Sequence, residues 1–298
     1  MRTLVTTCFL WCCAMLCSTS LWAVPQSAAS AMSKPTQLLF LVSQRNAETV
    51  AEAARRVAQL HPDIRIQART DTQLLELPSD QRRALLAGAD YVAGAGLFGA
   101  VVNELANDLR QQPIANLLLF NSDHRLVLQS KVAGNAVFPD KNTVESLSAQ
   151  RPDGDFDGWL TALLAQYPGQ APWLRARSYW QAGGAENSIR LLTWMAQQSG
   201  ARIQAQPARP QPRLRWWYQQ QYSARLPKLQ SRRPVVVILD HAGGERPSDS
   251  NLLSRMCAQA ATAHDLECLV GLATWGDASV QALESLQSLA PRIASVVM

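Results

Sequence analysis

Hydrophobic positions in the first half of the chain switch repeatedly between two spacings. Compact apolar runs such as QLLFLVS (37–43) are typical of buried strands, whereas NAETVAEAARRVAQLH (46–61) has its apolar residues at helical spacing. Further strands are predicted at IRIQART (64–70), ADYVAGAG (89–96) and PIANLLLFN (113–121), with helices between them. Strict alternation of strand and helix indicates a parallel sheet covered on both faces. We therefore expect a doubly wound α/β domain over residues 36–140.

The same alternation returns near the end of the chain. Strands are predicted at VVVILD (235–240), LECLVGLAT (266–274) and IASVVM (293–298), and helices over 248–264 and 278–289. These elements predict a second α/β unit over residues 234–298. We expect this unit to be incomplete and the chain to be the front part of a longer ancestral or actual protein, because no helix follows the last strand.

Two segments of different composition lie between these units. Residues 141–205 carry four tryptophans on stretches of helical period, which favours a helical connector. Residues 206–233 are rich in proline, arginine and aromatic residues and are interpreted as a linker. We expect the linker to be docked on the protein, since Trp216, Trp217 and Tyr218 would be costly to leave in water.

The N-terminus has the order of parts of a secretory signal. Arg2 precedes an apolar run of about 13 residues, and small residues follow it. We expect residues 1–31 to be a signal peptide, cleaved after Ala23 or after Ala31. The run is too short to span a bilayer comfortably, so a periplasmic or secreted protein is favoured over an inserted one. A lipoprotein at Cys17 is the alternative, although the residues before it lack the small side chain that lipidation sites favour.

Composition limits the function classes. A length of 298 residues is room for two domains, and the net charge of +5, which falls to about +4 without Arg2, is too small to indicate nucleic-acid binding. After signal cleavage only Cys257 and Cys268 remain, either as two buried thiols or as one disulfide. Four scattered histidines show no metal-ligand spacing, so no metal site is expected within the chain.

The loop after the strand at 235–240 is the most site-like position. Ligands of open α/β sheets bind beyond the carboxyl ends of the strands, where Asp240 and His241 would project beside a helix N-terminus. The structural alternative is that Asp240 only caps neighbouring backbone groups.

Other motifs are weaker. Gly94, Gly96 and Gly99 approach dinucleotide spacing, but no acidic residue follows at the required place, so a tight turn is favoured. No phosphate-binding lysine loop and no hydrolase triad is found, and catalytic residues stay unknown. The segment RLRWWYQQQY could offer Trp216 and Trp217 as a stacking platform for a planar ligand, or could simply be a docked linker.

The stretch SYWQAGGAENSIRLLTWM (178–195) places two glycines and a Glu-Asn pair before an amphipathic helix. Gly183 and Gly184 are expected to form a turn between helices, with Glu186 and Asn187 satisfying backbone donors at the next helix start or serving as ligand contacts. The Tyr-x-x-x-Gly-Gly-x-x-Asn pattern, followed by a linker into PVVVILD, resembles the N-terminal region of the CobN/magnesium-chelatase large-subunit family.

The resemblance covers essentially the mature chain but only the front portion of family members, which are far longer. It implies two flavodoxin-like units, a tetrapyrrole ligand, a divalent metal (cobalt or magnesium), and ATP hydrolysed by separate AAA+ subunits. No cofactor is expected to be intrinsic to the chain. Any metal-chelatase activity would require the missing C-terminal region, and the signal peptide makes the chain more similar to exported CobN-like proteins linked to tetrapyrrole uptake across the envelope. The alternative function is a periplasmic small-molecule-binding protein with two α/β lobes.

Overall fold

The computed structural model describes residues 34–298 except 153, 243–246 and 275, and it leaves out the side chains of 247–250. Residues 35–298 form one compact body by their internal contacts, and the two sheets within it, each with its helices, are called the first and the second unit. The expected signal peptide and the glycine pair after Ala242 lie outside the described residues.

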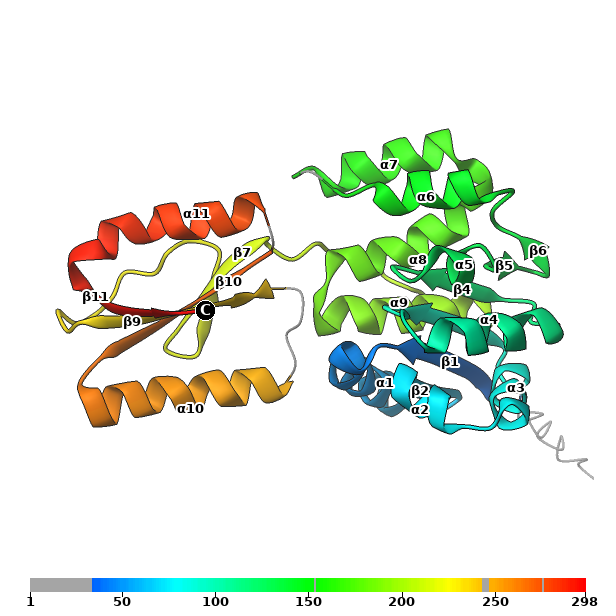
Figure 1. The fold of residues 1–298 in the computed structure, drawn as a ribbon, viewed down its shortest axis with the longest axis horizontal. Coiled ribbons are helices and arrows are strands. Elements are labelled where there is room, and N and C mark those ends of the chain that lie inside the picture. The colour runs from blue at the N-terminus through cyan, green and yellow to red at the C-terminus, as the bar shows by residue number, and fades with distance from the viewer. Residues whose placement is uncertain (1–33, 153, 243–246, 275) are drawn as a thin grey trace, which may run out of the picture. The chain divides into compact units, whose positions relative to one another are not determined.

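The first sheet has six strands in the order β2-β1-β3-β4-β5-β6 (Figure 1). Its strands are β1 (Thr36–Val42), β2 (Ile64–Thr70), β3 (Tyr91–Ala95), β4 (Leu117–Phe120), β5 (Lys131–Val132) and β6 (Asn135–Ala136). The first four strands of the sheet are parallel, and β5 and β6 continue it in antiparallel pairing. The order 2-1-3-4 is that of flavodoxin-like sheets, which confirms the predicted fold class for this unit.

Helices cover both faces of this sheet. They are α1 (Ala47–Leu60), α2 (Asp71–Glu76), α3 (Ser79–Ala87), α4 (Val101–Gln111), α5 (His124–Val127), α6 (Lys141–Ala149), α7 (Phe156–Gln166), α8 (Ala171–Ala182) and α9 (Gly184–Gln198), with short 3-10 turns at Gln44–Asn46 and Pro168–Gln170. Alternate β1 residues point to opposite faces. Leu38 and Phe40 join the core under α1, α8 and α9, whereas Leu39 and Leu41 join the core under α2, α3 and α4.

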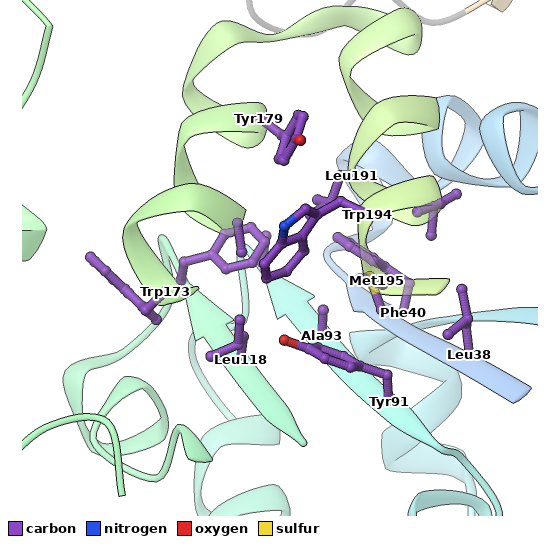
Figure 2. Close-up of a cluster of buried hydrophobic side chains, with 14 of the residues drawn as sticks. Leu38, Phe40, Tyr91, Ala93, Leu118, Trp173, Tyr179, Leu191, Trp194 and Met195 are labelled. Carbon is purple, nitrogen blue, oxygen red and sulfur yellow. The ribbon is translucent and has the colours of Figure 1, made fainter. Parts of the chain in front are cut away.

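Helices α8 and α9 form part of the first unit's core, which differs from the expected role of 141–205 as a connector. Figure 2 shows Trp173 and Trp194 lying over the strands that carry Phe40, Tyr91 and Leu118. The indole Nε1 of Trp173 donates to the carbonyl of Leu119 at 2.7 Å, and Trp194 packs edge-on against Tyr91 with ring centroids 6.0 Å apart. The apolar faces of these helices are buried because the sheet needs a second covering layer.

The second sheet has five strands in the order β11-β9-β10-β7-β8. They are β7 (Leu214–Tyr218), β8 (Gln221–Ser223), β9 (Val235–His241), β10 (Glu267–Ala273) and β11 (Ile293–Val297). β11, β9 and β10 are parallel to one another, as the alternation predicted. Helix α10 (Pro247–His264) contributes to the core on one face and α11 (Asp277–Leu286), followed by a 3-10 turn at Gln287–Arg292, to the core on the other (Figure 1).

Part of the expected linker is a hairpin of this second sheet. β7 pairs antiparallel with β10, and β8 pairs with β7 through a two-residue turn at Gln219 and Gln220, both with positive φ. Every residue of β7 is buried, so LRWWY lacks the alternation of a half-exposed strand. Because this aromatic run shows no alternation, the sequence pattern indicated a docked linker at these residues and not a strand.

A disulfide joins Cys257 of α10 to Cys268 of β10. The sequence left a disulfide and two free thiols as alternatives, and the structure has the disulfide. The bond ties the helix to the sheet that it covers.

Candidate functional site

A cavity of about 830 Å³ lies at strand ends of both sheets, and we call it the strand-end cavity. Asn121 directly follows β4, His241 ends β9 and Thr274 directly follows β10. Its remaining walls come from the α6–α7 connection, the end of α8 and the segment before β7: Arg151, Pro152, Gly154, Phe156, Trp180 to Gly183, Pro210 to Arg213, and Ala242. The carboxyl ends of parallel strands are where open α/β folds bind ligands.

An aromatic wall of the cavity is held by the first unit's core. The ring of Trp180 stacks on Phe40 with centroids 5.9 Å apart and leans against Phe120 at 6.0 Å. Phe156 supplies a second aromatic side chain to the lining. These rings give the cavity flat apolar surface whose orientation is set by packing.

Two amide side chains form a polar edge beside Trp180. Gln181 Nε2 donates to Asn121 Oδ1 at 3.1 Å. Asn121 has a φ of 47° and its carbonyl accepts from the backbone N–H of Gly96 at 3.0 Å, which fixes the turn after β4. An asparagine tolerates this left-handed conformation better than most residues.

The charged residues that line the cavity are basic. Arg151 and Arg213 both contribute to the lining, and no aspartate or glutamate does so among the residues whose side chains are described. Arg213 Nε also donates to Thr274 Oγ1 at 3.4 Å. Arginine donates paired N–H groups to carboxylates and phosphates, so this lining favours an anionic ligand.

The imidazole of His241 lies in the lining with a lowered pKa. Burial is the main cause and the positive charge of Arg45 adds to it, while Asp240 acts in the opposite direction. His241 is therefore neutral at neutral pH, and a neutral imidazole can accept a proton or coordinate a metal held by a ligand.

Asp240, the second residue predicted at this strand end, is placed differently. Its side chain is exposed and is not among those lining the cavity, and Oδ1 accepts the backbone N–H of His241 at 2.7 Å. This contact is the capping role that was the structural alternative for Asp240.

Asn187 clamps a segment that crosses the helices. We call residues 203–213 the strap. Nδ2 of Asn187 donates to the carbonyls of Gly183 and Arg209, each at 2.6 Å, and Oδ1 accepts the N–H of Arg209 at 2.8 Å. The side chain is only 2% exposed, so its amide is occupied by the chain itself. The last four residues of the strap, Pro210 to Arg213, form one wall of the strand-end cavity.

The neighbouring glycines and Glu186 have structural contacts. α8 ends at Ala182 and α9 begins at Gly184, with φ values of 71° at Gly183 and 77° at Gly184 that favour glycine. This agrees with the predicted turn. Glu186 forms an ion pair with Arg56 of α1 at 2.5 Å and does not line the strand-end cavity.

Trp216 and Trp217 are both buried within β7. Trp216 is 1% exposed in the core beneath α11, and Trp217 is 9% exposed in the core beneath α10. Their indoles fill the second unit's two cores, so the structure gives no support to a stacking platform at these residues.

Within the described part of the chain, no helix is long and apolar enough to cross a membrane. The same residues contain no group of three or more histidine, cysteine, aspartate or glutamate side chains placed to hold a metal ion.

No protein-family model and no curated protein matches the chain. Among solved structures it is similar to the catalytic subunit of cobaltochelatase from Mycobacterium tuberculosis, with 16% sequence identity and a TM-score of 0.44. The similarity covers 84% of this chain and 17% of that one, so this chain spans less than a fifth of that protein's length. At this TM-score the likeness carries no information about the activity of this chain.

The cavity residues that the sequence did not single out come from all three of its walls. They include Asn121 and Arg151, whereas Trp180, Gln181 and Arg213 lie in stretches that the sequence singled out for other roles. Asn121 could have been found, because it is the last residue of a predicted strand. The others lie at helix ends and in the strap, where local sequence carries no signal for a shared cavity.

Proposed function

We propose that this chain binds a tetrapyrrole in the strand-end cavity. The observation that carries the proposal is the cavity's lining, which combines flat aromatic surface with two arginines and one neutral histidine and has no described acidic side chain. A tetrapyrrole presents matching chemistry, namely a flat apolar ring, peripheral carboxylates and a centre that takes a metal.

Size supports this assignment. The volume of about 830 Å³ is near the upper end of the roughly 300–1,000 Å³ usual for small-molecule pockets. Trp180 and Phe156 would contact the face or edge of the ring, and Arg151 and Arg213 would pair with carboxylates at its rim. His241 would approach the ring through its neutral imidazole.

We further propose that the protein acts outside the cytoplasm. The disulfide between Cys257 and Cys268 supports this, because disulfides persist in oxidising compartments. The order of charge, apolar run and small residues in 1–31 supports it independently. The location is then the periplasm or the extracellular medium.

The resemblance of residues 178–195 to the CobN/magnesium-chelatase large-subunit family supports a role beside metal insertion or tetrapyrrole uptake. In this proposal the chain holds the tetrapyrrole, and cobalt or magnesium is cargo rather than a resident cofactor. For metal insertion, the chain would need the C-terminal region of the family and separate AAA+ subunits that hydrolyse ATP. For tetrapyrrole uptake, it would pass the ligand to envelope uptake proteins.

A second candidate is a periplasmic binding protein for another small anionic molecule. It is favoured by the lining itself, since residues at strand ends of both sheets contribute to one cavity. The two candidate functions differ in the molecule that the cavity binds, a tetrapyrrole in the first and a smaller anion in the second.

The test is a titration of the purified mature chain with haem and with a cobyrinate, following the tetrapyrrole absorption bands and tryptophan emission. We expect saturable quenching, and about 10-fold or more weaker binding in Arg213→Gln, because a hydrogen bond to a charged group contributes about 1.5–3 kcal/mol. Arg232→Gln removes the same charge from an exposed position and should bind normally. Unchanged spectra at micromolar ligand would exclude the tetrapyrrole, and saturable binding of a smaller anion would then favour the second candidate.

A further inference from the structure

Arg177 of α8 is a buried cation with unused donors. Its side chain is 0% exposed, and its guanidinium lies over the rings of Trp159 and Trp173, with Cζ 5.8 Å and 5.3 Å from their centroids. Nη2 donates to the carbonyls of Ser148 and Gln150 at the end of α6, but Nε and Nη1 have no hydrogen-bond partner among the described residues.

A second arginine stands at the same place. Arg151 Nη1 donates to the same two carbonyls, those of Ser148 and Gln150, so the two guanidinium groups are neighbours. Within the described chain neither arginine forms a salt bridge with an acid. The carbonyls at a helix end supply only about half a negative charge, which leaves the two positive charges incompletely compensated.

Two residues that contact Arg177 each carry a further buried polar atom without a hydrogen-bond partner in the described part of the chain. These atoms are the indole Nε1 of Trp159, whose ring faces the guanidinium, and the hydroxyl of Ser148, whose carbonyl Arg177 already contacts. Buried polar groups are nearly always hydrogen-bonded, so two unsatisfied atoms of Arg177 and one on each of two neighbouring residues indicate a missing group. Nε, Nη1 and the indole N–H are all donors, and the missing group must therefore be an acceptor.

We propose that Arg177, Arg151, Trp159 and Ser148 form a binding site for one carboxylate. A carboxylate supplies the missing charge and accepts several hydrogen bonds at once. It can come from a small acid in solution, or from the ligand of the strand-end cavity, because Arg151 also lines that cavity. The second source rests on the proposed function, whereas the first does not.

The first experiment measures the melting temperature of the mature chain as chloride is exchanged for formate at constant ionic strength. Ligands that bind only the folded state raise this temperature with concentration. We expect formate to raise it in the natural chain and not in Arg177→Met, where an apolar side chain of similar length replaces the buried charge. Arg175→Met, an exposed position on the same helix, should keep the response.

Trp159→Phe provides a milder variant that keeps an aromatic ring and removes the five-membered ring with its N–H. It should weaken the formate response while the protein stays folded, so the test does not depend on the fate of Arg177→Met. Asp153 lies outside the described residues, and Asp153→Asn tests whether the chain supplies its own carboxylate. A formate response that appears only in Asp153→Asn would overturn the proposal.

The second experiment compares a porphyrin bearing free carboxylates with its methyl ester. We expect the natural chain to bind the acid at least about 10-fold more tightly than the ester, and Arg177→Met to weaken binding of the acid while leaving binding of the ester unchanged. Equal binding of the acid by the natural chain and by Arg177→Met, with no formate response, would refute the carboxylate site and leave the proposed function intact. A formate response through Arg177 without porphyrin binding would refute the proposed function and leave the site.

Discussion

Replacing Asn187 with alanine should loosen the strap and destabilise the first unit. The variant loses three hydrogen bonds, from Nδ2 to the carbonyls of Gly183 and Arg209 and from the Arg209 N–H to Oδ1, at a position only 2% exposed. A net contribution of about 1 kcal/mol per bond gives a loss of about 3 kcal/mol in the free energy of unfolding. For a unit of this size that is a fall in melting temperature of about 6–12 °C.

Asn187→Asp sharpens the same test through pH. The new carboxyl would face the carbonyl oxygens of Gly183 and Arg209, so its ionised form is disfavoured and its pKa in the folded state is raised above that of the unfolded chain. Stability of this variant is therefore highest at low pH, and it is lost as the pH rises through the raised pKa.

Urea unfolding followed by circular dichroism and tryptophan emission at pH 4.5 and pH 7.5 measures both effects. Ser188→Ala is the matched control, because its hydroxyl only donates to a carbonyl within the same helix and its loss should cost less than about 0.5 kcal/mol. If Asn187→Ala is as stable as that control, the strap is not held by this side chain.

Three further outcomes follow from other contacts. Asp108→Ala should cost about 1.5–3 kcal/mol in urea unfolding, because the buried Arg82 loses the carboxylate that Nε contacts at 2.6 Å and keeps only Glu104 as an acidic partner among the described residues. A loss below about 1 kcal/mol would contradict that role. His241 should titrate by NMR with a pKa below the usual value near 6.5, because it is partly buried. The free energy of unfolding should therefore decrease as the pH falls from the unfolded-state pKa to the folded-state pKa, and His241→Gln should remove this decrease. A titration midpoint above 6.5 would refute the burial argument. Reducing the disulfide between Cys257 and Cys268 should lower the free energy of unfolding by about 2–4 kcal/mol, and a double serine variant should be insensitive to reductant; equal stability with and without reductant would contradict this expectation.

Much of the fold could be predicted from local pattern. The strand at 37–43 and the helix after it have different hydrophobic periods, and those periods belong to β1 and α1 as the structure has them. The aromatic strand β7 could not be found this way, because both of its faces are buried and its sequence carries neither period. The helices α8 and α9 were recognised as helical, but nothing in their spacing says which sheet they cover.

The candidate site was predictable only in part. His241 was identified because a residue at the carboxyl end of a parallel strand faces the ligand-binding edge of a sheet, and it does line the cavity. Its neighbour Asp240 has the same sequence signal, yet its side chain caps a backbone N–H instead. Asn187 was singled out with its glycines, but its partner Arg209 lies 22 residues away, beyond any local pattern.

The sequence by itself determined the alternation of strands and helices, the doubly wound class of both units and the turn at Gly183 and Gly184. These follow from backbone geometry and from hydrophobic periods, which act between residues near one another in the chain. Only the tertiary structure decided that Trp216 is core, that Arg151 and Arg177 share two carbonyls, and that strand ends, α8 and the strap enclose one cavity. Burial, charge compensation and cavity shape depend on which distant segments pack together, and no single segment carries that information.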